Sequence, residues 1–444
     1  MKRVSWLPEI RNVRPRRMPR SSCGVVLLLT LAAAALGAQA APKPAADSAK
    51  TAADSLQARL DRAEEAIRVL QQQVADQAGH AVQTRSRFAL EFNGLVLVTG
   101  FSNSRRVNNV DLPVFVLPDT NTGLPQSGAG MAIRQTRLGL SATAPDVLGA
   151  KFEGDLDVDF FGGQQSSNGG RTFPLLRLRT TRMQLTWKNA EVMIGQETPL
   201  FSDLNPISLA AVGSPEFSAS GNLWLWLPQI RAGVHTSGPV RVGVQGAVLA
   251  PTSGDPAGLF STDNDQAEKS SRPFLEGRTS LGWGEDEMAC EIGVAGHYGW
   301  FATKGDSLLV SSGWAVDAKL PLTRWLEIRG EGFTGQALKG LGGGGVGQGF
   351  GVGGAPVHTA GGWAQVNLKP DARVIIGGGY GYDDPRDSDL LPGGRLKNAT
   401  TEVHLHYRPV QPVVIGLTYR RLETTYASGK LANDHLNLAL GFEF

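Results

Sequence analysis

The chain has little cysteine and no surplus of charge of one sign. Its 444 residues include two cysteines, 43 Lys and Arg and 41 Asp and Glu. Seven of the basic residues and one acidic residue lie in residues 1–40, so the rest of the chain has 36 basic and 40 acidic groups, a formal charge of −4. Cys290 is the single cysteine of that part. A disulfide framework is therefore excluded, and the absence of a basic surplus argues against a nucleic-acid-binding protein.

Long hydrophobic runs are also missing, because no apolar stretch approaches the roughly 20 residues of a membrane-spanning helix. The longest run, residues 23–36, follows a segment rich in arginine and ends in Ala38-Gln-Ala40. This order is typical of a secretory signal peptide, so we expect residues 1–40 to be removed on export, with Met18 as an alternative start. A membrane anchor is the weaker alternative, since no basic stop-transfer residues follow the run.

Residues 41–55 are rich in Ala, Pro, Lys and Asp and are predicted to be a flexible linker. In residues 56–79 the apolar positions then follow alternating steps of four and three residues, which predicts a periplasmic coiled coil. Its predicted seam consists of Leu56, Leu60, Ala63, Ile67, Leu70 and Val74. A lone surface helix is the alternative reading, because the pattern covers only about three heptads.

From residue 88 the pattern changes to a period of two, which is typical of β-strands. In residues 150–161, apolar Phe152, Leu156, Val158 and Phe160 alternate with a charged row: Lys151, Glu153, Asp155, Asp157 and Asp159. A soluble core cannot bury such a row and lipid cannot accept it, so it must line water. Roughly sixteen such strands predict an all-β fold, a 16-stranded antiparallel transmembrane β-barrel over residues 88–444.

The connections and the final strand agree with an outer-membrane barrel. Short turns alternate with longer polar or glycine-rich loops, as periplasmic turns and extracellular loops do in an up-and-down barrel. Residues 435–444 alternate apolar and polar residues to the end, and we predict that Phe442 and Phe444 are a signal for the barrel assembly machinery. The edge strand of a soluble sandwich is the alternative.

A barrel of this size is too wide to be filled by its own side chains, so the sequence predicts a water-filled channel, a porin. The loop at residues 200–222 is unusually apolar, and we expect it to fold inward and narrow the pore, with Phe201, Asp203, Pro206 and Glu216 at the constriction. A position outside the barrel or at a subunit contact is the alternative.

Basic and acidic residues lie on neighbouring predicted strands. Arg137, Arg177, Arg179 and Arg182 stand close to the acidic row Glu153, Asp155, Asp157 and Asp159. Facing rows of opposite charge create a transverse field that orients solutes, and arginine binds carboxylates in a bidentate manner. The rows could equally neutralise each other as part of the wall.

A change of parity in residues 175–187 predicts a bulge near Thr180 and Thr181.

Four stretches resemble the DcaP-like outer-membrane porins and, more distantly, the phosphate-selective OprO and OprP porins. They are Ile133-Arg-Gln-Thr-Arg-Leu-Gly-Leu-Ser141, Lys151-Phe-Glu-Gly-Asp-Leu-Asp-Val-Asp-Phe-Phe161, Leu176-Arg-Leu-Arg179 and Val192-Met-Ile-Gly-Gln-Glu-Thr198. The resemblance implies a trimeric channel with a coiled-coil stalk that favours small anions such as dicarboxylates, with the four arginines lining the pore. The net acidic chain departs from the basic ladder of the phosphate-selective group.

Other functions have weaker support in the sequence. His404 and His406 alternate with apolar residues on one predicted strand, but no Ser or Asp pattern completes a catalytic triad, so we predict that the protein is not an enzyme. A metal site of His404, His406 and His435 would have poor ligand geometry, and we predict neither a metal nor another cofactor. A structural protein that tethers the outer membrane to the cell wall through the coiled coil is the remaining alternative.

Overall fold

The computed structural model describes residues 68, 82–83, 88–162, 174–254, 263–305 and 307–444. The predicted signal peptide, linker and coiled-coil seam lie outside these residues. Among the described residues, no helix is both long and apolar enough to cross a membrane.

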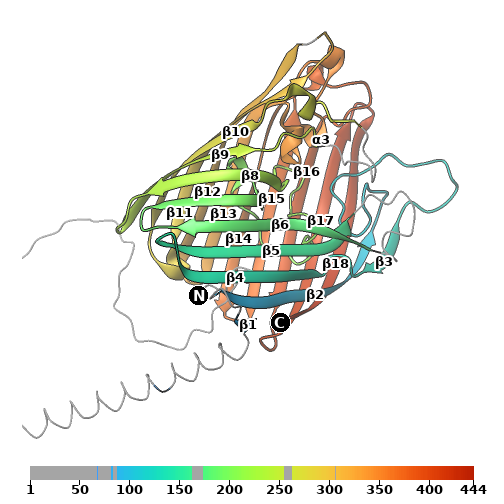
Figure 1. Cartoon of the computed structure of the whole chain (residues 1–444). Helices are drawn as coiled ribbons and strands as arrows, with labels where there is room; N and C mark the ends of the chain where they lie inside the picture. The colour runs from blue at the N-terminus through green and yellow to red at the C-terminus, as the bar shows by residue number, and fades with distance from the viewer. Residues whose placement is uncertain (1–67, 69–81, 84–87, 163–173, 255–262, 306) are drawn as a thin grey trace, which may run out of the picture. The chain divides into compact units, whose positions relative to one another are not determined.

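The strands follow one another around a closed antiparallel sheet (Figure 1). Their bounds are β1 (Val82–Gln83), β2 (Ala89–Asn103), β3 (Gly128–Ala132), β4 (Arg137–Val147), β5 (Ala150–Gly162), β6 (Leu175–Thr186), β7 (Ala190–Glu197), β8 (Leu227–His235), β9 (Val240–Leu249), β10 (Phe274–Trp283), β11 (Cys290–Ala302), β12 (Leu308–Thr323), β13 (Leu326–Gln336), β14 (His358–Asp371), β15 (Val374–Pro385), β16 (Lys397–Tyr407), β17 (Val413–Tyr426) and β18 (Gly429–Glu443). Each strand from β4 to β18 pairs with the next, and β18 pairs with β2 to close the barrel.

Strands β3 and β4 are two parts of one barrel strand, because both pair with β2. Between them, the side chain of Thr136 takes the place of backbone hydrogen bonds to β2. Its hydroxyl accepts a hydrogen bond from the Leu97 N–H at 3.0 Å and donates to the Leu97 carbonyl at 3.3 Å. Counted in this way, β2 to β18 form sixteen barrel strands, as the sequence predicted.

Among the described residues from 88 onward, the helical segments are short and lie in the connections. They are η1 (Leu200–Ser202), η2 (Glu268–Ser270), η3 (Asp286–Met288), η4 (Leu338–Leu341), α3 (Gly344–Gly347), η5 (Val352–Gly354) and η6 (Asp387–Asp389). The connections alternate in length along most of the barrel, as predicted: β4 and β5 are joined by two residues, whereas 29 residues separate β7 from β8. The pattern fails at the last hairpin, because two residues join β17 to β18 and five join β16 to β17. This alternation gives the barrel a turn rim and a loop rim.

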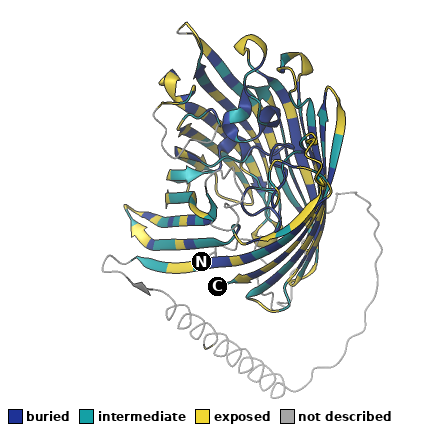
Figure 2. Cartoon of the chain, turned by 90° about the vertical axis from the view of Figure 1, so that its right-hand side faces the viewer, coloured by how far each residue is buried: buried dark blue, intermediate teal, exposed yellow. Residues whose placement is uncertain are grey.

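The two faces of the wall differ in polarity. In β18, Leu436, Leu438 and Leu440 are about half exposed, while the intervening His435 and Asn437 are almost fully buried. The same banding runs along the other strands (Figure 2). Apolar side chains therefore point outward, where lipid would cover them, and polar side chains point inward.

The predicted bulge is present, but it lies at Arg179 rather than at Thr180 and Thr181. Asp157 is opposite Thr180 and Val158 is opposite Leu178, so Arg179 is the extra residue. An extra residue shifts the alternation of faces by one position. As a result Arg177, Arg179 and Arg182 all form ion pairs with inward-facing aspartates of β5, although their sequence spacing is not strictly even.

Candidate functional site

The segment that joins β7 to β8 lies inside the barrel. Its first part is hydrogen-bonded to inward-facing side chains of three different strands. The Phe201 N–H donates to Glu276 of β10 at 3.1 Å, and the Ser202 hydroxyl donates to Glu331 of β13 at 3.0 Å. The Ile207 N–H then donates to the Gln365 side chain of β14 at 2.8 Å. We refer to residues 198–226 as the inner loop.

The middle of the inner loop is held by Gln135, which lies between β3 and β4. The Gln135 amide donates to the Ala210 carbonyl at 3.1 Å, and its oxygen accepts the N–H groups of Val212 at 2.7 Å and Gly213 at 2.8 Å. Gln135 is fully buried, so these bonds satisfy its polar atoms where water is excluded. Gln135 lies in the first porin-like stretch, but its contact with the loop could not be predicted, because it stands where the strand pattern is interrupted.

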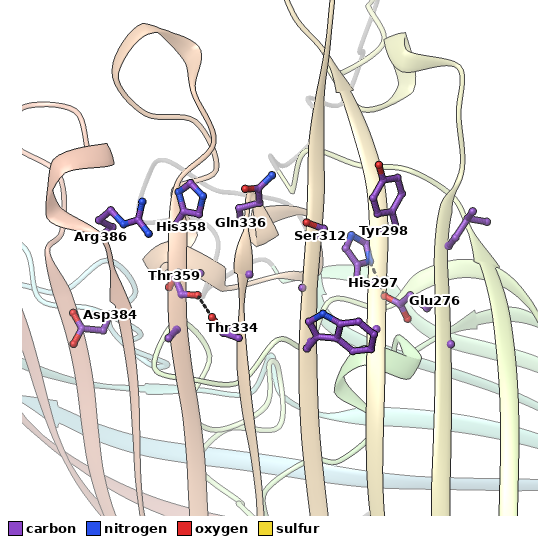
Figure 3. A pocket seen from close by; sticks show the side chains of 17 residues that line it. Glu276, His297, Tyr298, Ser312, Thr334, Gln336, His358, Thr359, Asp384 and Arg386 are labelled. Atoms are coloured by element: carbon purple, nitrogen blue, oxygen red, sulfur yellow. Dashed lines mark hydrogen bonds and ion pairs between the residues drawn. The ribbon is translucent and has the colours of Figure 1, made fainter.

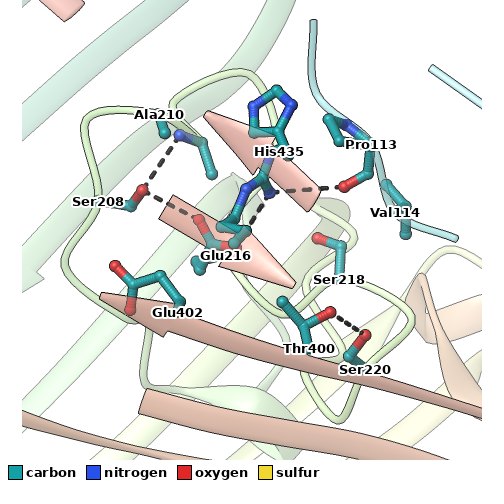
Figure 4. Close-up of polar contacts among 12 residues, drawn as sticks. Pro113, Val114, Ser208, Ala210, Glu216, Ser218, Ser220, Thr400, Glu402 and His435 are labelled. Atoms are coloured by element: carbon teal, nitrogen blue, oxygen red, sulfur yellow. Dashed lines mark hydrogen bonds and ion pairs between the residues drawn. The ribbon is translucent and has the colours of Figure 1, made fainter. Parts of the chain in front are cut away.

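The last part of the inner loop contacts the wall of β16 and β17 (Figure 4). Glu216 accepts a hydrogen bond from the Ser208 hydroxyl at 3.1 Å and forms an ion pair with Arg420 at 3.0 Å. The hydroxyls of Ser220 and Thr400 are 2.8 Å apart. At Gly221, which has a φ of +103°, a Cβ would come within 2.1 Å of the Gly362 carbonyl oxygen, so only glycine fits this close approach.

Apolar contacts also hold the inner loop. Leu209 is buried with Leu95, Leu97, Val414 and Ala439 of the wall. On another side, Leu200 and Phe201 belong to a larger buried cluster with Phe274, Phe301 and Phe333. The apolar character that made this loop unusual in the sequence thus serves to pack it against the wall.

The four predicted constriction-loop residues differ in exposure. Phe201 and Glu216 are buried and Pro206 is half-buried, so these three pack the loop. Asp203 is exposed. Among the four, Asp203 alone presents its charge to water.

The predicted basic and acidic rows are joined by ion pairs. Arg177 lies 2.6 Å from Asp159, and Arg179 lies 3.1 Å from Asp157 and 2.8 Å from Asp159. The remaining pairs of the set are Arg137 with Asp157, Arg182 with Asp155 at 2.6 Å, and Arg134 with Asp111 at 2.5 Å. We call these five arginines and four aspartates the basic cluster. Glu153 lies outside it, because its partner is Lys151.

The arginines of the basic cluster also bind the inner loop. Arg177 donates to the Gly213 carbonyl, and Arg179 donates to the Val212 carbonyl at 2.5 Å. Both guanidinium groups face the Trp226 ring, with the carbon of Arg179 4.3 Å from its centre and that of Arg177 5.3 Å away. These contacts position the loop next to the charges.

In each ion pair that joins two residues of the basic cluster, the arginine is more exposed than its aspartate. The exposed fractions are 24% and 0% for Arg177 and Asp159, and 35% and 21% for Arg182 and Asp155. Burial hides Asp159 and most of Asp157, so the charge at the water-facing surface is mainly positive. Arg179 is only 6% exposed and contributes little to that surface.

A second charged group lies further round the barrel, and of its residues only Asp203 was singled out from the sequence. Asp203 of the inner loop is 3.6 Å from Arg231 of β8 and 3.7 Å from Arg278 of β10. Arg278 also pairs with Asp317 at 2.6 Å and with Glu291 at 2.8 Å. Here the order of exposure is reversed, since Arg278 is 4% exposed whereas Asp203 is 32% and Glu291 45% exposed. We call these five residues the acidic cluster.

The three histidines weighed in the sequence all face the interior. His404 contacts Glu402 through Nδ1, and its ring stacks on that of His406 with centres 4.5 Å apart. His435 contacts Asn103 at 2.9 Å. Within the described part of the chain, no three His, Cys, Asp or Glu residues are placed to hold a metal ion.

Comparison with known proteins identifies the fold. The outer-membrane channel DcaP of Acinetobacter baumannii superposes with a TM-score of 0.64 at 18% identity, covering 82% of this chain and 99% of that one. The fold is that of an outer-membrane porin. The anion-selective porin of Comamonas acidovorans gives a TM-score of 0.52 at 13% identity, covering 80% of this chain and all of that one. OprB of Pseudomonas putida gives 0.50 at 12% identity, covering 80% and 94%.

Sequence comparison adds nothing to this structural similarity. No protein-family model matches the chain, and no curated protein matches it. The fold is thus shared at 18% and 13% sequence identity. Function has to be argued from the interior itself.

Proposed function

We propose that this protein is an outer-membrane porin, a passive diffusion channel for small hydrophilic solutes that favours small anions such as dicarboxylates. The fold, the polar inner face and the inner loop support a channel with a constriction. The observation that carries the anion preference is the order of exposure in the basic cluster, where arginine ends face water and their aspartates are buried.

The two clusters together would act as a selectivity filter. The basic cluster presents positive charge from β4 and β6, and the acidic cluster presents negative charge from the inner loop and β11. Charges on different parts of one wall produce a field across the channel, which orients a solute that carries both signs or a large dipole. Arg182 and Arg177 are the residues we assign to carboxylate binding, because both retain exposed guanidinium surface.

Planar-bilayer recordings of the purified protein test this proposal. In a gradient of potassium chloride, the sign of the reversal potential reports whether chloride or potassium passes more readily. We expect the sign of an anion-selective channel and a block of the current by millimolar succinate. A protein that forms no channels would contradict the porin assignment, and it would favour the tethering role considered from the coiled-coil pattern.

We further propose that the protein forms homotrimers and depends on its last residue for assembly. The Gly94 N–H donates to the Phe444 carbonyl at 3.0 Å, and the Phe444 N–H donates to the Gly94 carbonyl at 3.1 Å, so the terminus lies at the seam of the barrel. Deletion of Phe444 should reduce the heat-modifiable form recovered from outer membranes. Unchanged recovery would argue against Phe444 as the signal read by the barrel assembly machinery. Light scattering in detergent tests the trimer.

A further inference from the structure

The outer wall contains a hollow at the loop side of strands β10–β15 (Figure 3). Its volume is about 760 Å³, within the range of about 300–1,000 Å³ that is common for ligand pockets. The alternation of inward-facing and outward-facing residues along each strand places the hollow on the outside of the barrel. His297 of β11 faces the interior, where its ring lies 5.8 Å from that of Phe201 in the inner loop, so the neighbouring Gly296 and Tyr298 face outward.

The shape of the hollow follows from a contrast in side-chain size. Gly277, Gly296 and Ala360 form its floor, because they leave the backbone uncovered. Trp314, paired with Gly296, is 69% exposed and forms a wall. Leu275 and Tyr298 lie opposite each other and are each about two-fifths exposed. A long apolar chain would cover these surfaces better than water.

The upper margin of the hollow is polar. One register row runs across the strands through Ser312, Gln336, His358 and Arg386, and Figure 3 shows these side chains at one level. Arg386 is exposed and has no ion pair of 4.0 Å or less in the described residues. The His358 N–H and imidazole, with a smaller contribution from the charge of Arg386, hold the pKa of Asp389 below its ordinary value. His358 is therefore the hydrogen-bonded partner of this carboxylate, and the guanidinium of Arg386 stays exposed.

Aromatic residues flank the hollow on both sides. Tyr298 and Trp300 are in contact with ring centres 5.0 Å apart, and Tyr380 and Tyr382 stack at 6.2 Å. Tyrosine and tryptophan gather at the level of lipid headgroups, so these pairs place the polar row next to that level and the apolar floor below it. The guanidinium of Arg272 lies 5.2 Å from the Trp300 ring centre and adds a second cation at this level.

We propose that the hollow binds a phosphorylated, acylated lipid of the outer leaflet, the chemistry of lipopolysaccharide, with an acyl chain on the floor and a phosphate at Arg386. The proposal rests on the assigned outer-membrane location, in which the long loops face outward. It does not depend on which solutes pass through the channel. Arginine matches a phosphate by its planar fork of donors. Of the carboxylates near Arg386 in the sequence, Asp384 and Asp389 pair with Lys397 and His358, and Asp387 is exposed beside it.

Native mass spectrometry of the full mature chain in mild detergent tests the proposal, with purified hexa-acylated bisphosphorylated lipid A as the probe. We expect binding to the wild type, and an affinity about fivefold lower for Arg386→Gln, the effect of roughly one surface charge on an anionic lipid. Gly277→Leu should also weaken binding, because the nearest atom to a Cβ there is 3.8 Å away and the added side chain would enter the hollow.

Three controls keep the test specific. Arg421→Gln removes an arginine from the outer face of β17, and Gly100→Leu adds a side chain to open space on β2; both should bind as the wild type does. Dephosphorylated lipid A should bind more weakly than the intact probe. Equal binding of both lipids, or wild-type affinity in Arg386→Gln, would overturn the proposal.

A second copy of the chain is the competing occupant of the hollow. A Ser312→Cys variant made in a Cys290→Ser background distinguishes the two, because a disulfide between copies would show that protein covers the hollow. That result would overturn the lipid site. Bilayer conductance of the same variants should equal that of the wild type, so that loss of lipid binding and loss of channel function are separate readouts.

Discussion

The basic cluster and the acidic cluster are built from the same kinds of ion pair, yet they present opposite charges to water. In the basic cluster three of the four aspartates lie on β5 beneath their arginines, so Asp159 is fully buried while Arg177 is 24% exposed. In the acidic cluster Arg278 is 4% exposed beneath Asp203 and Glu291, which are 32% and 45% exposed. The depth of each partner, rather than the count of charges, decides what a solute meets.

The inner loop enters the two clusters in different ways. It offers backbone carbonyls of Val212 and Gly213 to the arginines of the basic cluster. To the arginines of the acidic cluster it offers a carboxylate, that of Asp203. The inner loop thus leaves positive charge exposed at the basic cluster and covers positive charge with a carboxylate at the acidic cluster.

Removing most of the inner loop should have the largest effect, because it takes away the segment that crosses the interior and its contacts with Arg177 and Arg179 of the basic cluster. Replacement of residues 204–222 by a short Gly-Ser linker is expected to raise single-channel conductance several-fold and to weaken selectivity, since the loop crosses the interior from β14 to β4 and back to β16. The wall strands pair with one another and do not need the loop for their ladders. Conductance equal to that of the wild type would show that the loop does not limit the pore.

Arg182→Gln and Asp155→Asn should shift selectivity in opposite directions. Among the described residues Arg182 pairs with Asp155 and makes no hydrogen bond to the inner loop, so each variant changes one charge without releasing the loop. Loss of Arg182 should favour cations and loss of Asp155 should favour anions, each by up to about fivefold in the permeability ratio, or about 1 kcal/mol for a charge at 4 Å in water. Shifts in the same direction would refute an electrostatic filter. Arg421→Gln, on the outer face, is the matched control.

Asp203→Asn tests the acidic cluster and should have a smaller effect. It uncovers Arg231 and Arg278, so anion preference should increase in the reversal-potential assay. The effect is limited because Arg278 remains paired with Asp317 and Glu291. A shift toward cations would show that this cluster does not face the permeation path.

Raising the salt concentration should have the smallest effect of the four changes, and it should weaken the influence of both clusters on selectivity to the same extent. The screening length falls from about 10 Å at 0.1 M to about 3 Å at 1 M, so selectivity should decline as salt is raised. Pairs buried in the wall are screened less, and the folded barrel should keep its heat-modifiable mobility on gels over the same range. Selectivity that is independent of salt would indicate that pore size, rather than charge, selects solutes.

Much of this arrangement could be predicted from the sequence. The alternation of faces in β5 and β18, and the alternation of short and long connections, depend on local geometry and predict the sixteen strands directly. The apolar residues of the inner loop, among them Leu209 and Phe201, favoured an inward fold over a subunit contact, because packing within the barrel would bury them. The position of the bulge was predicted to within one residue of Arg179.

The remainder depends on contacts between distant segments. Asp317 alternates with apolar Val316 and Ala318 as an inward residue should, but the pattern does not indicate that Asp203 reaches Arg278 from the inner loop. Gln135 lies in a break of the strand pattern, where periodicity carries no information. The relative depth of Arg177 and Asp159 follows from the bulge and from loop packing, and neither can be measured from spacing alone.

The reversal potential of single channels in a tenfold gradient of potassium chloride, recorded for the wild type and for the Arg177→Gln, Arg182→Gln double variant, tests the central claim most directly. The account predicts an anion-selective wild type and a reversal potential that moves clearly toward cation selectivity in the double variant, with Arg421→Gln unchanged. A wild type that prefers cations, or a double variant with the wild-type reversal potential, would contradict the claim that exposed arginines of the basic cluster set the selectivity of this channel.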